Sequence, residues 1–155
     1  SDCAKVGGCK PGTPQGDWLA QDLASSTAHC TLALWHHPRF SSGEHGDQLQ
    51  VAPFWQMLYD AHADLILNGH DHDYERFAPM DPSGKETRPN GIREIVVGTG
   101  GGALREFHEI QPNSEFRLQK VFGVLQLTLH PASYDWQFMP ADGSQITDAG
   151  STPCH

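Results

Sequence analysis

The residues of this sequence with the clearest chemical potential are its histidines, which number 10 in 155 residues. They are concentrated in the first half of the chain, at His29, His36, His37, His45, His62, His70 and His72. Neutral imidazole is a common protein ligand for zinc, iron and similar transition metals. The concentration of histidines therefore makes metal binding the first chemistry to test.

Three of these histidines follow apolar segments that are typical of buried strands. His36 comes directly after residues 30–35, and His70 and His72 come after residues 64–68. Alternate residues of an extended segment face the same side, so we expect His70 and His72 to point together. The carboxyl ends of neighbouring strands meet at one edge of an α/β sheet, where ligand sites lie. The sequence predicts that the three imidazoles converge there; the alternative is separate surface histidines bound to water.

The elements that must position these histidines form a mixed α/β (α+β) pattern with a β-rich C-terminal half. Helical spacing of apolar residues predicts helices at 14–26 and 51–62. Apolar runs and alternating patterns predict strands at 30–35, 64–68, 95–97, 121–129 and 134–138. The last two strands should form an antiparallel hairpin. Residues 98–102 are rich in glycine, and we interpret them as a tight turn near the metal site. A nucleotide-binding loop is disfavoured because no apolar helix follows it.

Composition narrows the class of protein. The chain has the length of one domain, residues 1–155, and its net charge is −9, which argues against a nucleic-acid backbone as a partner. No apolar run reaches the ~18 residues that a membrane span needs. The tryptophans are expected to be core residues rather than a substrate platform; they are Trp18, Trp35, Trp55 and Trp136.

The four cysteines favour an oxidising, extracytoplasmic compartment, because an even number at wide spacing fits a disulfide framework. A short Gly-Gly loop separates Cys3 from Cys9, which favours a Cys3–Cys9 pair and leaves Cys30 for Cys154. Four cysteines permit three connectivities, and four unpaired thiols are the alternative. The start at Ser1, without an initiator Met, is expected of a mature secreted protein or of an excised fragment.

Residues 34–38 and 69–72 resemble the last two metal motifs of the calcineurin-like metallophosphoesterases, and most of all their secreted purple-acid-phosphatase-like branch. The longer segments 37–46 and 67–76 are also similar to that branch and occur in its order. The resemblance implies that His36 and His70 share one metal ion and that His72 holds a second ion. It also implies that His45 faces the substrate phosphate and acts in catalysis.

The neighbours of these ligands have expected supporting roles. Tyr74, Glu75 and Arg76 should anchor the metal-binding loop from behind, with Glu75 and Arg76 paired to each other. His37 is adjacent to a ligand, so we expect it to point away and to form a structural hydrogen bond.

The resemblance is incomplete, because the family's earlier metal motifs, including the bridging Asp, do not occur in this sequence. The chain therefore resembles the C-terminal half of an αββα metallophosphoesterase sandwich. The missing N-terminal half is the implied partner, and an uncovered sheet edge is expected to promote self-association.

These observations predict a secreted hydrolase of phosphoric monoesters or diesters. The resemblance implies a cofactor of two divalent or trivalent ions, of the Fe, Zn or Mn class. The isolated chain is expected to be inactive because it carries only part of the ligand set. The rival hypothesis is a non-catalytic secreted module with a histidine metal site, and a third is a stable proteolytic remnant without a function of its own.

Overall fold

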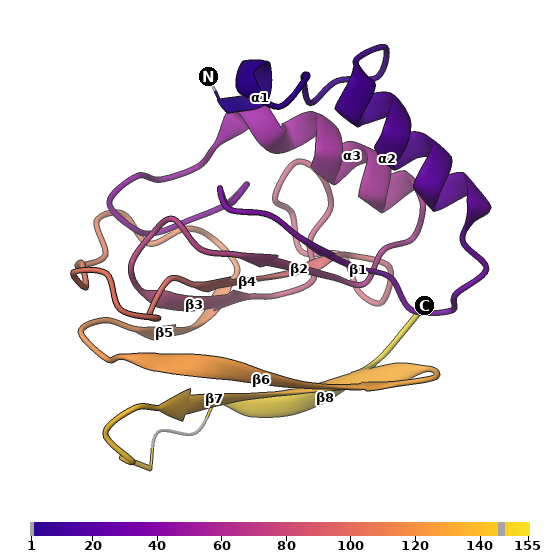
Figure 1. Ribbon diagram of the computed structural model, residues 1–155. Coiled ribbons are helices and arrows are strands. Elements are labelled where there is room, and N and C mark those ends of the chain that lie inside the picture. Colours follow the sequence, from indigo (N-terminus) through magenta and orange to yellow (C-terminus); the bar gives the residue numbers. More distant parts are fainter. Residues whose placement is uncertain (1, 146–147) are drawn as a thin grey trace.

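The molecule has three layers, which are a pair of long helices, a central five-stranded sheet and a second, three-stranded sheet (Figure 1). The computed structural model describes residues 2–145 and 148–155. Its elements are α1 (Asp2–Lys5), α2 (Pro14–Ser25), β1 (Leu32–Leu34), a 3₁₀ turn (Leu49–Val51), α3 (Ala52–Asp60), β2 (Leu65–Asn68), β3 (Tyr74–Phe77), β4 (Arg93–Val97), β5 (Ser114–Leu118), β6 (Gly123–His130), β7 (Ser133–Pro140) and β8 (Ala149–Pro153). The predicted mixed α/β class and the β6–β7 hairpin are confirmed.

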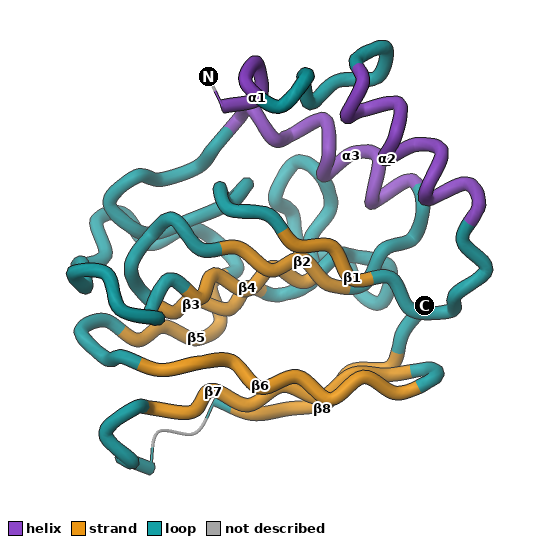
Figure 2. Tube along the Cα trace, viewed as in Figure 1, coloured by secondary structure: helices purple, strands orange, loops and turns teal. Residues whose placement is uncertain are grey.

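The central sheet has the strand order β1-β2-β4-β3-β5. Strands β1, β2 and β4 are parallel, so their carboxyl ends lie at one edge, and β3 and β5 run antiparallel to them. Figure 2 shows that many of the loops gather at this end of the sheet. This arrangement brings the segments after β1 and β2 side by side, as the sequence predicts for His36 and His70.

Two apolar cores hold the layers together. One lies between the helices and the central sheet and is built around Trp55, Leu58 and Ile66. The other lies between the two sheets and is built around Tyr74 and Phe138. Both faces of the central sheet are therefore buried, which explains the apolar runs at residues 65–67 in β2 and 95–97 in β4.

Strand β1 is an edge strand whose outer side pairs with no other strand in the described part of the chain. Leu34 at its end is 73% exposed, and Trp18 on the neighbouring helix α2 is 60% exposed. The expectation that tryptophans are core residues is therefore wrong for Trp18. Its ring lines a groove between α2 and β1, at the edge where a further strand could pair.

Both favoured disulfides, Cys3–Cys9 and Cys30–Cys154, are present. The second bond joins cysteines 124 positions apart and ties the C-terminal tail to the start of β1. The first bond spans only 6 positions. The described residues contain no free cysteine.

Removal of the long-range disulfide should destabilise the chain more than removal of the short one. The double variant Cys30→Ser/Cys154→Ser is expected to lose about 2–5 kcal/mol, because the bond restricts a much longer loop in the unfolded chain. Urea unfolding of this variant, beside the matched Cys3→Ser/Cys9→Ser variant, measures the difference. A larger loss in the short-loop variant would contradict this expectation.

Candidate metal centre

Three imidazoles meet at the carboxyl end of the parallel strands. His36 follows β1 and His70 follows β2, and His36 Nε2 lies 3.2 Å from His70 Nδ1. The ring of His37 lies 4.2 Å from the ring of His70. Ring nitrogens of His36, His37 and His70 all lie within 4.8 Å of one another. A set of three neutral imidazoles suits a transition-metal ion such as zinc.

The position of His37 differs from the prediction that it points away from the ligands. That prediction assumed extended backbone, but the chain bends at His36 and His37 directly after β1. The bend is fixed by hydrogen bonds: Gly69 N donates to the His36 carbonyl at 3.0 Å, and the Trp35 indole donates to the His37 carbonyl at 2.6 Å. Two neighbouring side chains can therefore face the same side.

His72 lies outside this group of three. Residues 70–73 are bent rather than extended, and His70 has a φ of 66°, which is uncommon for a residue with a side chain. The Nδ1 atom of His72 lies 2.8 Å from the carbonyl oxygen of Ala103. The structure thus brings two of the three predicted ligands together and places the third against the glycine-rich segment.

The glycine-rich segment is shaped for this close approach. A Cβ atom added to Gly102 would lie 2.6 Å from Cε1 of His72. A Cβ atom added to Gly98 would lie 1.8 Å from the carbonyl oxygen of Asp71. Side chains at these positions would collide with the metal-site loop, so the glycines support the interpretation of a tight turn beside it.

Burial and crowding keep His70 neutral. The pKa of His70 is lowered to about 4, first by burial and then by the neighbouring imidazoles of His37, His45 and His36. Asp71 opposes this shift. A neutral imidazole retains the nitrogen lone pair that a metal ion requires, so the site favours the ligand form of His70.

His45, the predicted catalytic residue, is held beside His70 by a buried carboxylate. Its ring lies 4.2 Å from the His70 ring, and its Nδ1 lies 2.8 Å from Asp71 Oδ1. The same oxygen accepts the His45 backbone N–H at 2.9 Å, while Ser41 Oγ donates to Asp71 Oδ2 at 2.5 Å. An Nδ1–H bonded to Asp71 leaves Nε2 directed elsewhere as the reactive nitrogen.

Further buried carboxylates fix the loop that carries His45. Glu94 on β4 accepts the backbone N–H groups of Arg39 and Phe40 at 2.8 and 3.0 Å. Glu75 on β3 accepts both the backbone N–H and the hydroxyl of Ser42. The pKa of Glu94 is raised to about 8, mainly by burial, although these backbone donors lower it. The supporting roles of Asp71 and Glu94 were not predicted from the sequence. The feature that could have indicated them is an acidic residue inside or directly after an apolar segment.

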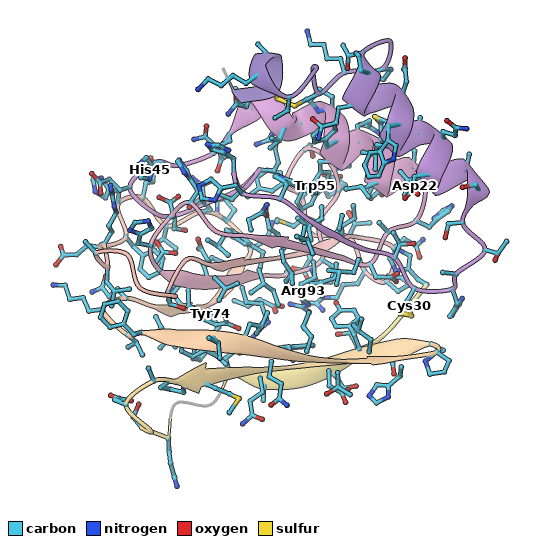
Figure 3. All side chains as sticks on the ribbon, in the orientation of Figure 1. Asp22, Cys30, His45, Trp55, Tyr74 and Arg93 are labelled. Carbon is cyan, nitrogen blue, oxygen red and sulfur yellow. A yellow bond between two sulfur atoms is a disulfide. The ribbon has the colours of Figure 1, made fainter. Side chains whose placement is uncertain are left out.

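The predicted pairing of Glu75 with Arg76 is wrong. Neighbouring residues of a strand face opposite sides, so Glu75 reaches the His45 loop while Tyr74 and Arg76 face the second sheet. The hydroxyl of Tyr74 donates to Asp148 at 2.5 Å, and Arg76 donates to both oxygens of Asp148 at 2.8 Å. Figure 3 shows Tyr74 on the side of the central sheet that faces the second sheet, and His45 among the loops above it.

Comparison with known proteins identifies several relatives. The chain is 31% identical to purple acid phosphatase 21 of Arabidopsis thaliana over 147 residues, which cover 86% of this chain and 33% of that protein. It is 26% identical to acid phosphatase A of Cryphonectria parasitica over 88% of this chain and 30% of the relative. No model of a known protein family matches the chain.

The fold has solved counterparts. A purple acid phosphatase, PPD1, from yellow lupin (Lupinus luteus) seeds superposes with a TM-score of 0.82 and 22% identity, over 93% of this chain and 29% of that chain. GAP50, the anchor in the inner membrane complex of Plasmodium, superposes with a TM-score of 0.72 and 20% identity, over 90% and 42% of the two chains. The chain spans about a third of the length of its curated relatives.

The described helices include none that is long and apolar enough to span a lipid bilayer.

Proposed function

The chain belongs to the calcineurin-like metallophosphoesterases, in their purple-acid-phosphatase-like branch, and from this premise we propose that it is the C-terminal half of a phosphoric-ester hydrolase domain. The observation that carries the proposal is the contact of 3.2 Å between His36 and His70, with His45 held beside them by Asp71. The relatives named above are phosphatases, and the arrangement supplies both metal ligands and a group for the phosphate.

In the complete domain, His36 and His70 would hold one ion and His72 a second ion, through the nitrogen that does not face Ala103. The ions would be divalent or trivalent and of the Fe, Zn or Mn class. A pair of such ions supplies an activated water and offsets the charge of a phosphate. The residues of this chain then have the tasks of fixing the ligand nitrogens, orienting the substrate and moving a proton.

The proton-moving group in this proposal is His45. Asp71 fixes the ring through Nδ1, so that Nε2 is the atom that contacts a phosphate oxygen or protonates the leaving oxygen. The carboxylates of Glu75 and Glu94 hold the loop beneath it and thereby set the position of the ring. A positioned acid of this kind contributes roughly 10²–10⁴-fold to the rate of such reactions.

The partner in this proposal is the N-terminal half of the same domain, which would supply the acidic bridge between the two ions. The unpaired edge of β1, together with the exposed Trp18 and Leu34, is the surface we assign to it. Without that cover the edge would favour association between copies of the chain. The two disulfides support a secreted or extracytoplasmic location.

Kinetics of the complete domain test the role of His45. His45→Ala is expected to lower kcat for p-nitrophenyl phosphate about 10²–10⁴-fold with a smaller change in KM, because the metal ligands stay in place. His108→Ala serves as the matched control, since His108 has an exposed side chain. Unchanged kcat in the His45 variant would remove it from the reaction. Parallel assays with bis(p-nitrophenyl) phosphate decide between monoesters and diesters.

The rival function, a non-catalytic module that binds one metal ion, is favoured by a different observation. The group of His36, His37 and His70 contains imidazole nitrogens and no carboxylate oxygen among the described residues. A complete domain that binds metal but has no activity towards either substrate would favour this rival.

A further inference from the structure

We propose that His37 is a third metal ligand, so that His36, His37 and His70 together bind one divalent ion of the zinc class in this chain, before any further ligand is added. The inference rests on the proposed function for His36 and His70, and it adds a ligand that the family resemblance does not imply. It also makes metal binding a property of this chain alone.

The distances fit three ligands of one ion. A tetrahedral zinc site has Zn–N bonds of about 2.0–2.1 Å, which places its nitrogens roughly 3.4 Å apart. His36 Nε2 and His70 Nδ1 are 3.2 Å apart, and all three imidazoles offer a nitrogen within 4.8 Å of the others.

The backbone beneath the imidazoles is fixed in advance. The side-chain amide of Asn68 donates to the Trp35 carbonyl at 2.9 Å, and the Trp35 indole donates to the His37 carbonyl. Gly69 N donates to the His36 carbonyl, which joins the two ligand loops. Ligands on such a supported backbone lose little freedom when they bind an ion.

The strained conformation of His70 fits the same interpretation. Its φ of 66° lies in the left-handed region, which is unfavourable for a residue with a side chain. The turn directs His70 between the rings of His37 and His45, at 4.2 Å from each. Strained residues of this kind concentrate at functional sites.

His72 cannot replace His37 in this group without moving. Its Nδ1 faces the Ala103 carbonyl, and its ring is packed against Gly102. Three imidazoles leave one tetrahedral position open for water or a phosphate oxygen, as in catalytic zinc sites. His45, which is already bonded to Asp71 through Nδ1, lies beside the group.

Zinc titration of the full chain tests the inference. In calorimetric titrations with zinc chloride, His36→Ala, His37→Ala and His70→Ala are each expected to weaken binding at least about 10-fold, because each removes a direct ligand. The surface control His108→Ala is expected to change it less than about two-fold. Circular dichroism and thermal melts of the metal-free variants verify that each remains folded.

Nitrogen NMR of the unmodified chain gives a second readout that needs no substitution. Addition of one equivalent of zinc should shift the ring ¹⁵N resonances of His36, His37 and His70, and leave those of His72 nearly unchanged. If His36 and His70 shift but His37 does not, the third ligand is refuted while the proposed function stands. If none of the three shifts and none of their variants weakens binding, both the inference and the proposed metal ligands fail.

Discussion

The isolated chain is expected to hydrolyse p-nitrophenyl phosphate no faster than the metal ion alone. Hydrolysis by two ions requires an acidic bridge that holds them about 3.5–4 Å apart. Among the described residues, the group around His36 and His70 contains no carboxylate. Asp71 lies nearest in the sequence, but it is buried and bonded to Ser41 and His45. The described residues therefore offer the proposed ligands for one ion and no carboxylate bridge for a pair.

The expected effect is large because residues that act as a unit are not additive. Loss of one essential member of such a unit removes nearly all of the rate that the unit supplies. Activity should appear when the chain is folded together with the N-terminal half of a purple acid phosphatase domain, and His36→Ala should abolish it. Release of p-nitrophenol, with and without added zinc, iron or manganese, measures both outcomes. Metal-stimulated turnover by the chain alone, lost in His36→Ala, would show that its own residues suffice.

The sequence predicts the placement of His36 and His70 well because that placement follows from local rules. Apolar segments form buried strands, parallel strands end at one edge, and a residue directly after a strand lies at that edge. The contact between the two imidazoles confirms this reasoning. The early helices and the β6–β7 hairpin follow from periodicity in the same way.

Features that depend on the backbone after the strands could not be predicted in this way. His37 joins His70 because the chain bends, and His72 is separate because residues 70–73 do not continue as a strand. A period of two residues holds only for extended backbone. The bend depends on partners distant in sequence, such as Asn68 bonded to the Trp35 carbonyl.

Strand β3 was missed for a related reason. Its four residues, Tyr74–Phe77, include one acidic and one basic side chain, so they lack the apolar pattern of an internal strand. Both charges have buried partners: Glu75 bonds the Ser42 loop, and Arg76 bonds Asp148. These hydrogen bonds offset the cost of burying the two charged side chains, which the strand itself could not do. The spacing of residues in the sequence does not predict such distant partners.

Asp73 should make the stability of the chain fall as pH rises. Its side chain is fully buried, and neither carboxylate oxygen has a hydrogen-bond partner. The pKa of Asp73 is raised to about 8, first by burial and then by the carboxylates of Asp71 and Glu75. The folded chain therefore keeps a proton that the unfolded chain releases above about pH 4. Because the folded state binds more protons in this window, the free energy of unfolding decreases between about pH 4 and pH 8.

Substitution Asp73→Asn isolates this effect, because asparagine has nearly the same shape and does not titrate. Relative to the unmodified chain, the variant should be more stable by roughly 1–2 kcal/mol at pH 5 and by roughly 5 kcal/mol at pH 8. Urea unfolding at both pH values, with EDTA present to exclude metal ions, measures the difference. The titration of Glu94 also affects stability, but it cancels in the comparison because both proteins contain Glu94. The exposed Asp60 on α3 provides the control, and Asp60→Asn should change stability by less than about 0.5 kcal/mol at either pH. An equal effect of Asp73→Asn at pH 5 and pH 8 would show that the carboxyl is ionised throughout this range, as it would be if a buried partner compensated its charge.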